Sequence, residues 1–435
     1  FPVIVELLLL LAALFVLCMY CQNQLIRSKP EDEGDLTFFY VMISLGSFIG
    51  GIATSWVIPL LSAELIEYLI GLIVIAMTLP APKTAGAHGK IYYIRMVVYF
   101  VIFMTVWPVV FYEYNIVALI FMVLVVVAVY RELVKEKDFV VICLGCLLCV
   151  LPYSEMFWRN EVSIHKKRNY YGTLRVVETR GTRLLYHGTT LHGSQVLGPE
   201  NEREPTMYYD RHSPVAGVMT SDRFNFKKIG TVGLGVGMVA AYTRPGQTLD
   251  FYELDPDVGT VADGFFTYTK NAAARVRTIY GDARLSLDKR PGAKYDLIVI
   301  DAFGGDAIPV HLLTVEMVAK YKQHLNPRGI ILFHVSNRYL QLSPALARVA
   351  YAAGTNVCYK MGRSSTYTGL VTTWVGMTWD HDYFTTLTED LKWGKYNKDA
   401  VIKKYRPWTD DYSSVLPIIK SDELIIAVRK LKLGN

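Results

Sequence analysis

The chain has 435 residues, of which 52% are hydrophobic and 19% are charged, and this composition is too apolar for a wholly soluble protein. The apolar excess lies in residues 1–153, which carry 8 Lys and Arg against 11 Asp and Glu, whereas the remainder carries 37 against 28 and is basic. The basic part has no arginine-rich helix, zinc knuckle or aromatic ribonucleoprotein signature, so nucleic acid is not an expected partner. Nearby anionic lipid headgroups account for the charge more simply.

Six apolar runs in the first part are of about the length that spans a membrane. They occupy residues 2–21, 36–61, 64–79, 91–112, 115–130 and 138–153. The first run begins without an initiator Met, so we expect further sequence upstream. Basic residues follow the first, third, fifth and sixth runs, and the positive-inside rule therefore gives conflicting sides for the later domain. Five of the six cysteines lie in these runs, so we expect neither a metal site nor a disulfide framework.

The chain that follows predicts a small β subdomain at 154–220. Two alternating strands, 169–179 and 183–187, flank a glycine turn and predict a β-hairpin. His187 ends the second of these strands, and His192 lies in the glycine-containing stretch that follows. Catalysis is one possibility for these histidines, and local hydrogen bonding is the more common role of a histidine in a turn.

A glycine-rich turn after the apolar strand 228–232 is the strongest motif in the chain. Gly233, Gly235 and Gly237 stand at alternate positions, and a helical pattern begins at Met238. Glycines let the backbone approach a ligand closely, and a following helix would point free N–H groups at it. A dinucleotide motif would have a third glycine where Met238 stands, so nicotinamide cofactors are disfavoured.

Acidic residues end the strands that follow. Glu253 lies about 20 residues after the first glycine, the spacing from which a carboxylate binds ribose hydroxyls. Asp282 and Asp301 end two further strands, and a doubly wound parallel sheet would bring such strand ends together. We therefore predict a nucleoside site, although each acid taken singly is more often a helix N-cap. The expected parts are a multi-span transmembrane domain at 1–153, the β subdomain at 154–220, a Rossmann-like domain at 221–380 and an extension at 381–435.

The order of these motifs carries a family resemblance. Gly-Leu-Gly-Val-Gly, Glu-Leu-Asp, Gly-Asp-Ala and Ile-Asp-Ala-Phe, after a β-hairpin domain, resemble the spermidine synthase (polyamine aminopropyltransferase) branch of the class I methyltransferase-like fold. The match covers about residues 170–376, and the whole chain resembles bacterial inner-membrane proteins in which a multi-span segment is fused to such a domain. The resemblance implies a homodimer that acts on a small amine. A nucleoside cosubstrate made in the cytoplasm, and the basic residues after the sixth run, favour a cytoplasmic catalytic domain beside membrane lipid.

The resemblance also implies residue roles. The cosubstrate would be decarboxylated S-adenosylmethionine or S-adenosylmethionine, with no tightly bound cofactor and no metal. Catalytic roles would fall to Asp301, Asp306 and one of Tyr208 and Tyr209; donor binding to Gly233, Gly235, Gly237, Glu253, Asp282 and Ala283; and acceptor binding to His187, Gln195, Asp410 and Asp411.

Two departures from the family pattern bear on the donor. Val236 stands where aminopropyltransferases have an aspartate that holds the free amine of the decarboxylated donor. The family's Asp-Ser-Ser-Asp-Pro loop is replaced by a sequence that begins at Asp301 and spaces its acids differently. We expect aminopropyl transfer to an amine with release of methylthioadenosine. The alternatives are a methyltransferase or sulfonium lyase that uses intact S-adenosylmethionine, and a non-enzymatic polyamine carrier or sensor.

Overall fold

A computed structural model describes residues 3–63, 67, 70–71, 74–75, 163–188, 190–302, 309–337, 340–364 and 371–420. The chain divides into two units, Phe1–Asn160 and Glu161–Asn435. Apart from residues 154–160, the predicted subdomain, Rossmann-like domain and C-terminal extension fall in the second unit.

The first unit contains long apolar helices. Helix α1 spans Val3–Arg27, and a continuous helical stretch is formed by α2 (Glu33–Ile52), the π-helical turn η1 (Ala53–Val57) and α3 (Ile58–Leu61). Asp32 caps α2 by accepting a hydrogen bond from the backbone N–H of Gly34. The π turn directly precedes the turn that contains Pro59, whose missing N–H disrupts the regular hydrogen-bond ladder.

One helix among the described residues, Glu33–Leu61, is long and apolar enough to cross a membrane, with 29 residues and a mean hydropathy of 1.8. It contains the predicted span 36–61. The predicted span 2–21 falls largely within α1, and the four predicted spans between residues 64 and 153 lie largely or wholly outside the described residues.

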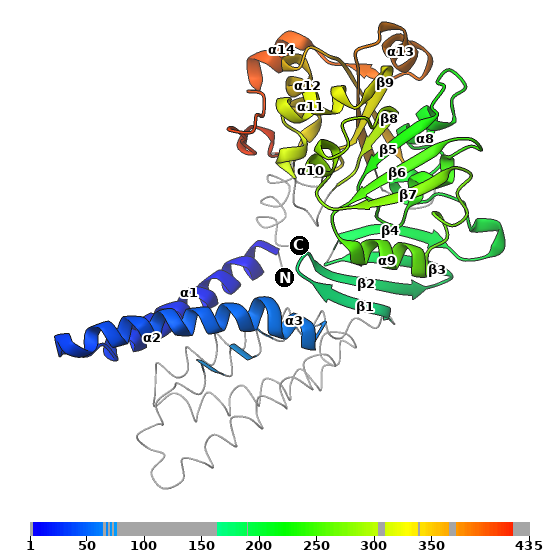
Figure 1. The fold of residues 1–435 in the computed structure, drawn as a ribbon. Helices are drawn as coiled ribbons and strands as arrows, with labels where there is room; N and C mark the ends of the chain where they lie inside the picture. The colour runs from blue at the N-terminus through cyan, green and yellow to red at the C-terminus, as the bar shows by residue number, and fades with distance from the viewer. Residues whose placement is uncertain are drawn as a thin grey trace, which may run out of the picture. The chain divides into compact units, whose positions relative to one another are not determined.

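The second unit begins with a four-stranded antiparallel sheet in the order β1-β2-β3-β4 (Figure 1). The strands are β1 (Ser163–Asn169), β2 (Gly172–Thr179), β3 (Thr182–His187) and β4 (Thr190–Val196). Strands β2 and β3 form the predicted hairpin, in which Thr179 pairs with Thr182. Arg180 and Gly181 between them have φ values of 48° and 72°, the two positive values of a type I′ turn.

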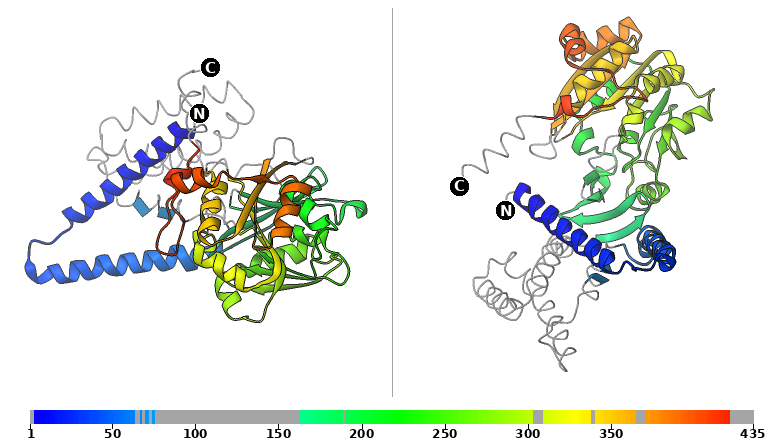
Figure 2. Two further views of the ribbon diagram at one scale, coloured as in Figure 1. Left: turned by 90° about the horizontal axis from the view of Figure 1, so that it is seen from above. Right: turned by 90° about the vertical axis from the view of Figure 1, so that its left-hand side faces the viewer.

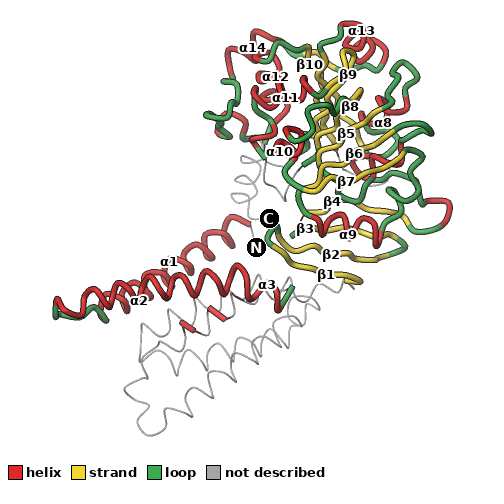
Figure 3. The backbone as a smooth tube through the Cα atoms, in the orientation of Figure 1, coloured by secondary structure: helices red, strands yellow, loops and turns green. Residues whose placement is uncertain are grey.

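The second sheet has eight strands in the order β12-β10-β11-β9-β8-β5-β6-β7 (Figure 3). Its five parallel strands are β5 (Lys228–Val232), β6 (Thr248–Glu253), β7 (Arg275–Tyr280), β8 (Tyr295–Ile300) and β9 (Leu325–His334). Strand β11 (Val371–Thr378) runs antiparallel to β9, β10 (Asn356–Arg363) runs antiparallel to β11, and the short β12 (Gly394–Lys395) runs antiparallel to β10. The expectation of an all-parallel sheet is therefore wrong at this edge.

Helices cover both faces of the large sheet, because its strands are hydrophobic on both sides (Figure 2). In β6, for example, Leu249 and Phe251 face one core while Tyr252 faces the other. The first core includes residues of α8 (Pro214–Thr220), α9 (Pro256–Phe265) and α13 (His381–Thr385). The second includes residues of α10 (Ala283–Asp288), α11 (Val315–Gln323), α12 (Leu342–Ala352) and α14 (Lys398–Lys404). The doubly wound arrangement is as predicted.

Short helices fill the connections. They are η3 (Pro199–Asn201), η4 (Met207–Tyr209), η5 (Met238–Tyr242), η6 (Val310–Leu312), the π turn η7 (Thr386–Asp390) and η8 (Leu416–Ile418). The helix predicted after the glycine turn is only the five-residue 3₁₀ helix η5. Pro245 follows it closely, and a proline cannot continue a helix and disfavours helical backbone at Arg244 before it.

Candidate active site

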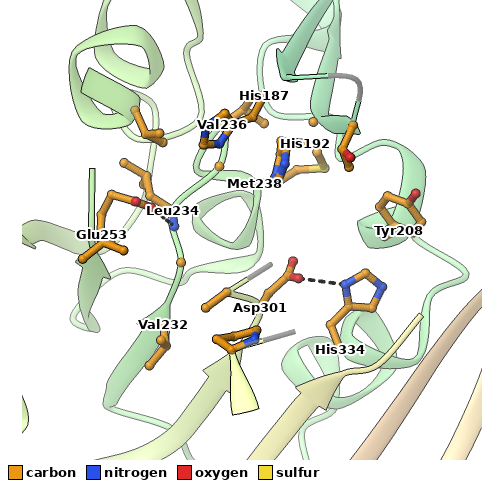
Figure 4. A pocket seen from close by; sticks show the side chains of 18 of the residues that line it. His187, His192, Tyr208, Val232, Leu234, Val236, Met238, Glu253, Asp301 and His334 are labelled. Atoms are coloured by element: carbon orange, nitrogen blue, oxygen red, sulfur yellow. Dashed lines mark hydrogen bonds and ion pairs between the residues drawn. The ribbon is translucent and has the colours of Figure 1, made fainter. Parts of the chain in front are cut away.

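A cavity of about 790 Å³ lies at the carboxyl ends of the parallel strands. Strand β5 has β6 on one side and β8 on the other, so the strand order reverses here, and this is the position where open α/β sheets bind ligands. The predicted site residues that line the cavity are Gly233, Gly235, Glu253, Asp282, Ala283, Asp301, His187, Tyr208 and Tyr209. Figure 4 shows Glu253 and Asp301 on either side of the chain that leaves β5.

The glycine turn begins where two strand ends touch. Gly233 has a φ of 94°, and a Cβ atom there would lie 2.1 Å from the backbone oxygen of Asp301. Only glycine fits this contact, since a side chain would meet both the strained backbone angle and the carbonyl. The turn and the end of β8 are therefore held against each other.

Glu253 holds the turn from the other side. Its Oε2 accepts a hydrogen bond from the backbone N–H of Leu234 at 2.8 Å, and its Oε1 accepts one from Asp255 at 2.9 Å. Burial raises the pKa of Glu253, and the backbone N–H donors act in the opposite direction. Each carboxylate oxygen has a second acceptor position, so the group can also receive hydroxyl donors from a ligand.

Asp282 is the N-cap of α10. Its Oδ1 accepts a hydrogen bond from the backbone N–H of Leu285 at 2.9 Å, and its Oδ2 lies 3.1 Å from Nε2 of His311. Asp282 thus has the N-cap role considered from sequence, and the same side chain lines the cavity.

Asp301 has a partner on each of its two carboxylate oxygens. Its Oδ1 lies 2.8 Å from Nδ1 of His334 (Figure 4). Its Oδ2 accepts a hydrogen bond from the Tyr209 hydroxyl at 2.5 Å. Burial acts to raise the pKa of Asp301, but the His334 ring and the hydrogen bonds from His334 and Tyr209 outweigh it and lower the pKa. Asp301 is therefore a carboxylate at neutral pH.

Both tyrosines of η4 line the cavity, and this short helix begins with an unusual backbone conformation. Met207, at the start of η4, is buried and has a φ of 54°, which is rare for a residue other than glycine. Burial and the charge of Asp301 raise the pKa of Tyr209, which keeps its hydroxyl as a donor. The Tyr208 ring lines the cavity and lies 5.0 Å from the His334 ring.

His334 is a site residue that sequence reasoning missed. It ends β9, the strand next to β8, so its side chain reaches Asp301 across adjacent strand ends. Trp374 of β11 stacks on the imidazole at 4.9 Å and fixes its orientation. The available signal was a histidine next to the end of the apolar run 330–335, which has the pattern of a strand.

The two histidines of the first sheet differ in their surroundings. Nε2 of His187 lies 2.9 Å from the backbone oxygen of Tyr171, which is the local role considered from sequence. Nε2 of His192 is buried and has no hydrogen-bond partner among the described residues. Burial, and then the nearby His187, lower the pKa of His192 to about 4, so its ring is neutral at neutral pH and adds no positive charge to the cavity.

Val236 occupies the position where the family pattern has an aspartate. Its side chain is 1% exposed and packs on strand β4, where a Cβ atom at Gly193 would lie 2.5 Å from the Val236 Cγ2. The valine thus joins the glycine turn to the first sheet.

Several predicted residues lie elsewhere. The Gln195 side-chain oxygen accepts a hydrogen bond from the Thr267 backbone N–H, and its nitrogen donates to the Thr267 hydroxyl. The nitrogen also donates to the backbone oxygen of Glu202. Gln195 therefore links the first sheet to the chain after α9. Asp410 forms a two-pronged pair with Arg284 and accepts a hydrogen bond from Thr314. Gln195, Asp410, Asp411 and Gly237 are not among the described residues that line the cavity, and Asp306 lies outside the described residues.

Comparison with known proteins gives curated relatives. No protein-family model matches the chain. A polyamine aminopropyltransferase from Vibrio vulnificus (strain CMCP6) is 31% identical over 202 residues, which cover 44% of this chain and 64% of the relative. A probable polyamine aminopropyl transferase from Bifidobacterium longum (strain NCC 2705) is 24% identical over 224 residues, which cover 51% of this chain and 47% of the relative.

The match spans less than two thirds of each of these relatives. Among solved structures, a probable spermidine synthase from Corynebacterium glutamicum ATCC 13032 aligns with 58% of this chain and 98% of its own, at 16% identity and a TM-score of 0.44. Over the matched region, the chain is similar to polyamine aminopropyltransferases, as the order of its motifs predicts.

Proposed function

We propose that the protein transfers an aminopropyl group from an S-adenosyl sulfonium donor to a small amine and releases methylthioadenosine. The observation that carries the proposal is the gathering of the glycine turn, Glu253, Asp282 and Asp301 around one cavity at the strand-order reversal. The similarity to polyamine aminopropyltransferases supports the same reaction class.

In this proposal the donor lies across the ends of β5, β6 and β7. Glu253 accepts hydrogen bonds from the ribose hydroxyls, and Asp282 with Ala283 contacts the adenine. Gly233, Gly235 and Gly237 form the turn on the sulfonium side. Because glycines have no side chain, the backbone of this turn can approach the donor closely.

Asp301 acts on the acceptor amine. An ammonium has no lone pair, so it has to lose a proton before or as its nitrogen attacks the carbon next to sulfur. The carboxylate attracts the cation, accepts its proton, and is held in place by His334 and Tyr209. As the new C–N bond forms, the C–S bond breaks and its electron pair stays on sulfur, so a neutral thioether leaves.

The surroundings of Asp301 suit this step. Its lowered pKa keeps it ionised when the amine arrives, and the neutral His192 does not repel a sulfonium or ammonium group. Tyr208 is proposed to pack beside the reacting groups from the open side of the cavity.

A second candidate has the same fold and intact S-adenosylmethionine as the donor. Val236 favours it, because a buried valine offers no carboxylate to the free amine of a decarboxylated donor. Methyl transfer would then leave S-adenosylhomocysteine, and a lyase would leave methylthioadenosine without an aminopropylated amine.

Product analysis tests these proposals. The purified full chain is incubated with each donor and a mixture of small amines, and the products are identified by mass spectrometry. Methylthioadenosine together with an aminopropylated amine supports the first proposal. S-adenosylhomocysteine, or methylthioadenosine without any modified amine, refutes it in favour of the second.

We further propose that the helix Glu33–Leu61 anchors the enzyme in a membrane, which its length and apolar surface support. Fractionation of expressing cells tests this, because an anchored chain stays in the membrane fraction after a carbonate wash. The cytoplasmic side stays a prediction from the sequence, and the homodimer stays a prediction from the resemblance.

A further inference from the structure

A second cavity, of about 550 Å³, lies at the opposite edge of the large sheet, where the parallel strands begin. It is lined by Lys228, Thr248, Arg275 and Tyr295, each of which is the first residue of its strand. The proposed function uses none of these residues.

The cavity exists because α10 is too short to cover its part of the sheet. Its six residues extend about 9 Å, whereas the six residues of β7 extend about 20 Å. The chain after α10 then passes the amino ends of the strands and contributes Arg290 and Lys294 to the cavity wall. The uncovered strip of the sheet becomes the floor.

The lining carries a strong positive charge. Five basic side chains face a single acid, Asp250, among the described lining residues. They are Lys228, Arg275, Arg277, Arg290 and Lys294. So many like charges around one space repel each other, and an anion between them would relieve that repulsion.

Asp250 offsets only one of these five positive charges, so the described lining keeps an excess of four. Arg277 donates to its two carboxylate oxygens at 3.0 and 2.7 Å, and the buried Tyr295 hydroxyl donates to Oδ2 at 2.8 Å. Arg290 lies 3.8 Å from the same oxygen. The acid therefore orients two guanidinium groups at the wall, and further N–H groups of each can still bind a ligand.

We propose that this cavity binds a phosphate-bearing anion. Planar guanidinium groups match the geometry of phosphate oxygens, and the lysines add charge without directional demand. The volume exceeds that of a single inorganic phosphate, so the ligand is a polyphosphate, a phosphorylated metabolite or a phospholipid headgroup.

The test uses the purified full chain and two probes. The first probe is sodium tripolyphosphate, titrated by calorimetry at low and high salt. The second is a set of phosphatidylcholine vesicles made with and without phosphatidylglycerol, because a free and a lipid-borne phosphate share the same chemistry. The apolar helices contribute equally to binding of both vesicle types. The difference in binding between the two vesicle types therefore reports on the phosphatidylglycerol headgroup.

The variant is Lys228→Gln with Arg275→Gln, since both side chains start strands at exposed positions. The matched control removes the same charge elsewhere through Lys270→Gln with Lys403→Gln, both exposed and outside the cavity. We expect the variant to bind tripolyphosphate about five- to thirtyfold more weakly than the parent chain. Binding by the control is expected to stay close to that of the parent.

The site is supported if tripolyphosphate binds the variant more weakly than the parent and binds the control as tightly as the parent. A selective loss of the preference for phosphatidylglycerol supports it as a headgroup site. The single variant Arg275→Gln serves if the double variant does not fold. Absence of both kinds of binding in the parent, or equal effects in variant and control, overturns the proposal.

Discussion

Replacing Asp301 with asparagine is the most direct test of the proposed chemistry. The substitution keeps the shape of the side chain but removes its charge and one of its two acceptor oxygens. His334 and Tyr209 both approach this group, so the new amide can accept from only one of them and presents its own N–H donors to the other.

The expected loss of turnover follows from the role of the carboxylate. A positioned general base contributes about a hundred- to ten-thousandfold, equivalent to about 3 to 5 kcal/mol of activation free energy. The accompanying loss of stability should be smaller, about 1.5 to 3 kcal/mol for one charge-assisted hydrogen bond. Affinity for methylthioadenosine should stay nearly unchanged, because Glu253 and Asp282 are proposed to hold the nucleoside.

The assay is a single-turnover measurement of methylthioadenosine release, with nucleoside affinity measured by calorimetry and folding followed by thermal denaturation. Asp263→Asn is the control, since Asp263 is exposed and accepts a hydrogen bond from Thr269 outside the cavity. A folded Asp301→Asn chain that turns over at the parent rate would refute the proposed role of Asp301.

Four further substitutions test separate parts of the structure. Glu253→Ala should weaken methylthioadenosine binding about tenfold or more in calorimetry, as the loss of hydrogen bonds to a charged group predicts; unchanged affinity would remove Glu253 from the nucleoside site. The pKa of His192 is lowered to about 4 from 6.5, so the unfolded chain binds more protons between these values and the stability of the parent falls as pH drops through this window. His192→Phe should flatten that dependence in urea unfolding, and an unchanged slope would contradict the assignment. Arg284 lowers the pKa of Asp410 to about 2 from 3.8, so their pair contributes above the higher value and is lost as pH falls toward the lower one. Asp410→Asn should therefore cost up to about 1 kcal/mol of unfolding free energy at pH 7 and much less as the pH approaches the lowered pKa, and a cost that does not change with pH would argue against the pair. Gly233→Ala should destabilise the protein more than Gly246→Ala in thermal denaturation, because both glycines have positive φ but only the first would meet a backbone atom at 2.1 Å. Equal losses of stability in the two variants would mean that the backbone at Asp301 moves to accommodate the new methyl group.

The main features of the cavity could be predicted because they depend on local sequence and one general rule. A β-branched strand followed by alternating glycines predicts a tight turn, and acids that end parallel strands meet at one edge of the sheet. Glu253, Asp282 and Asp301 follow this rule and line the same cavity. The hairpin about Arg180 and Gly181 was equally local.

Other features depend on which strands become neighbours, and periodicity does not contain that information. His334 reaches Asp301 because β9 pairs with β8, and Trp374 stacks on it because β11 joins the other side of β9. Asp410 pairs with Arg284, which lies 126 positions earlier in the sequence. The Asp-Asp motif alone therefore could not show that Asp410 lies outside the cavity lining. The short helix η5 was a different case, since Pro245 was a readable stop signal.

The contact between Gly193 and Val236 limits how the proposed donor preference could change. An aspartate introduced at position 236 would be pressed against the backbone of β4, where an ionised group loses its hydration without a built-in partner. Any side chain at position 193 would in turn displace the valine. These two positions are thus expected to change together in evolution, and a laboratory search for altered donor preference should randomise them as a pair.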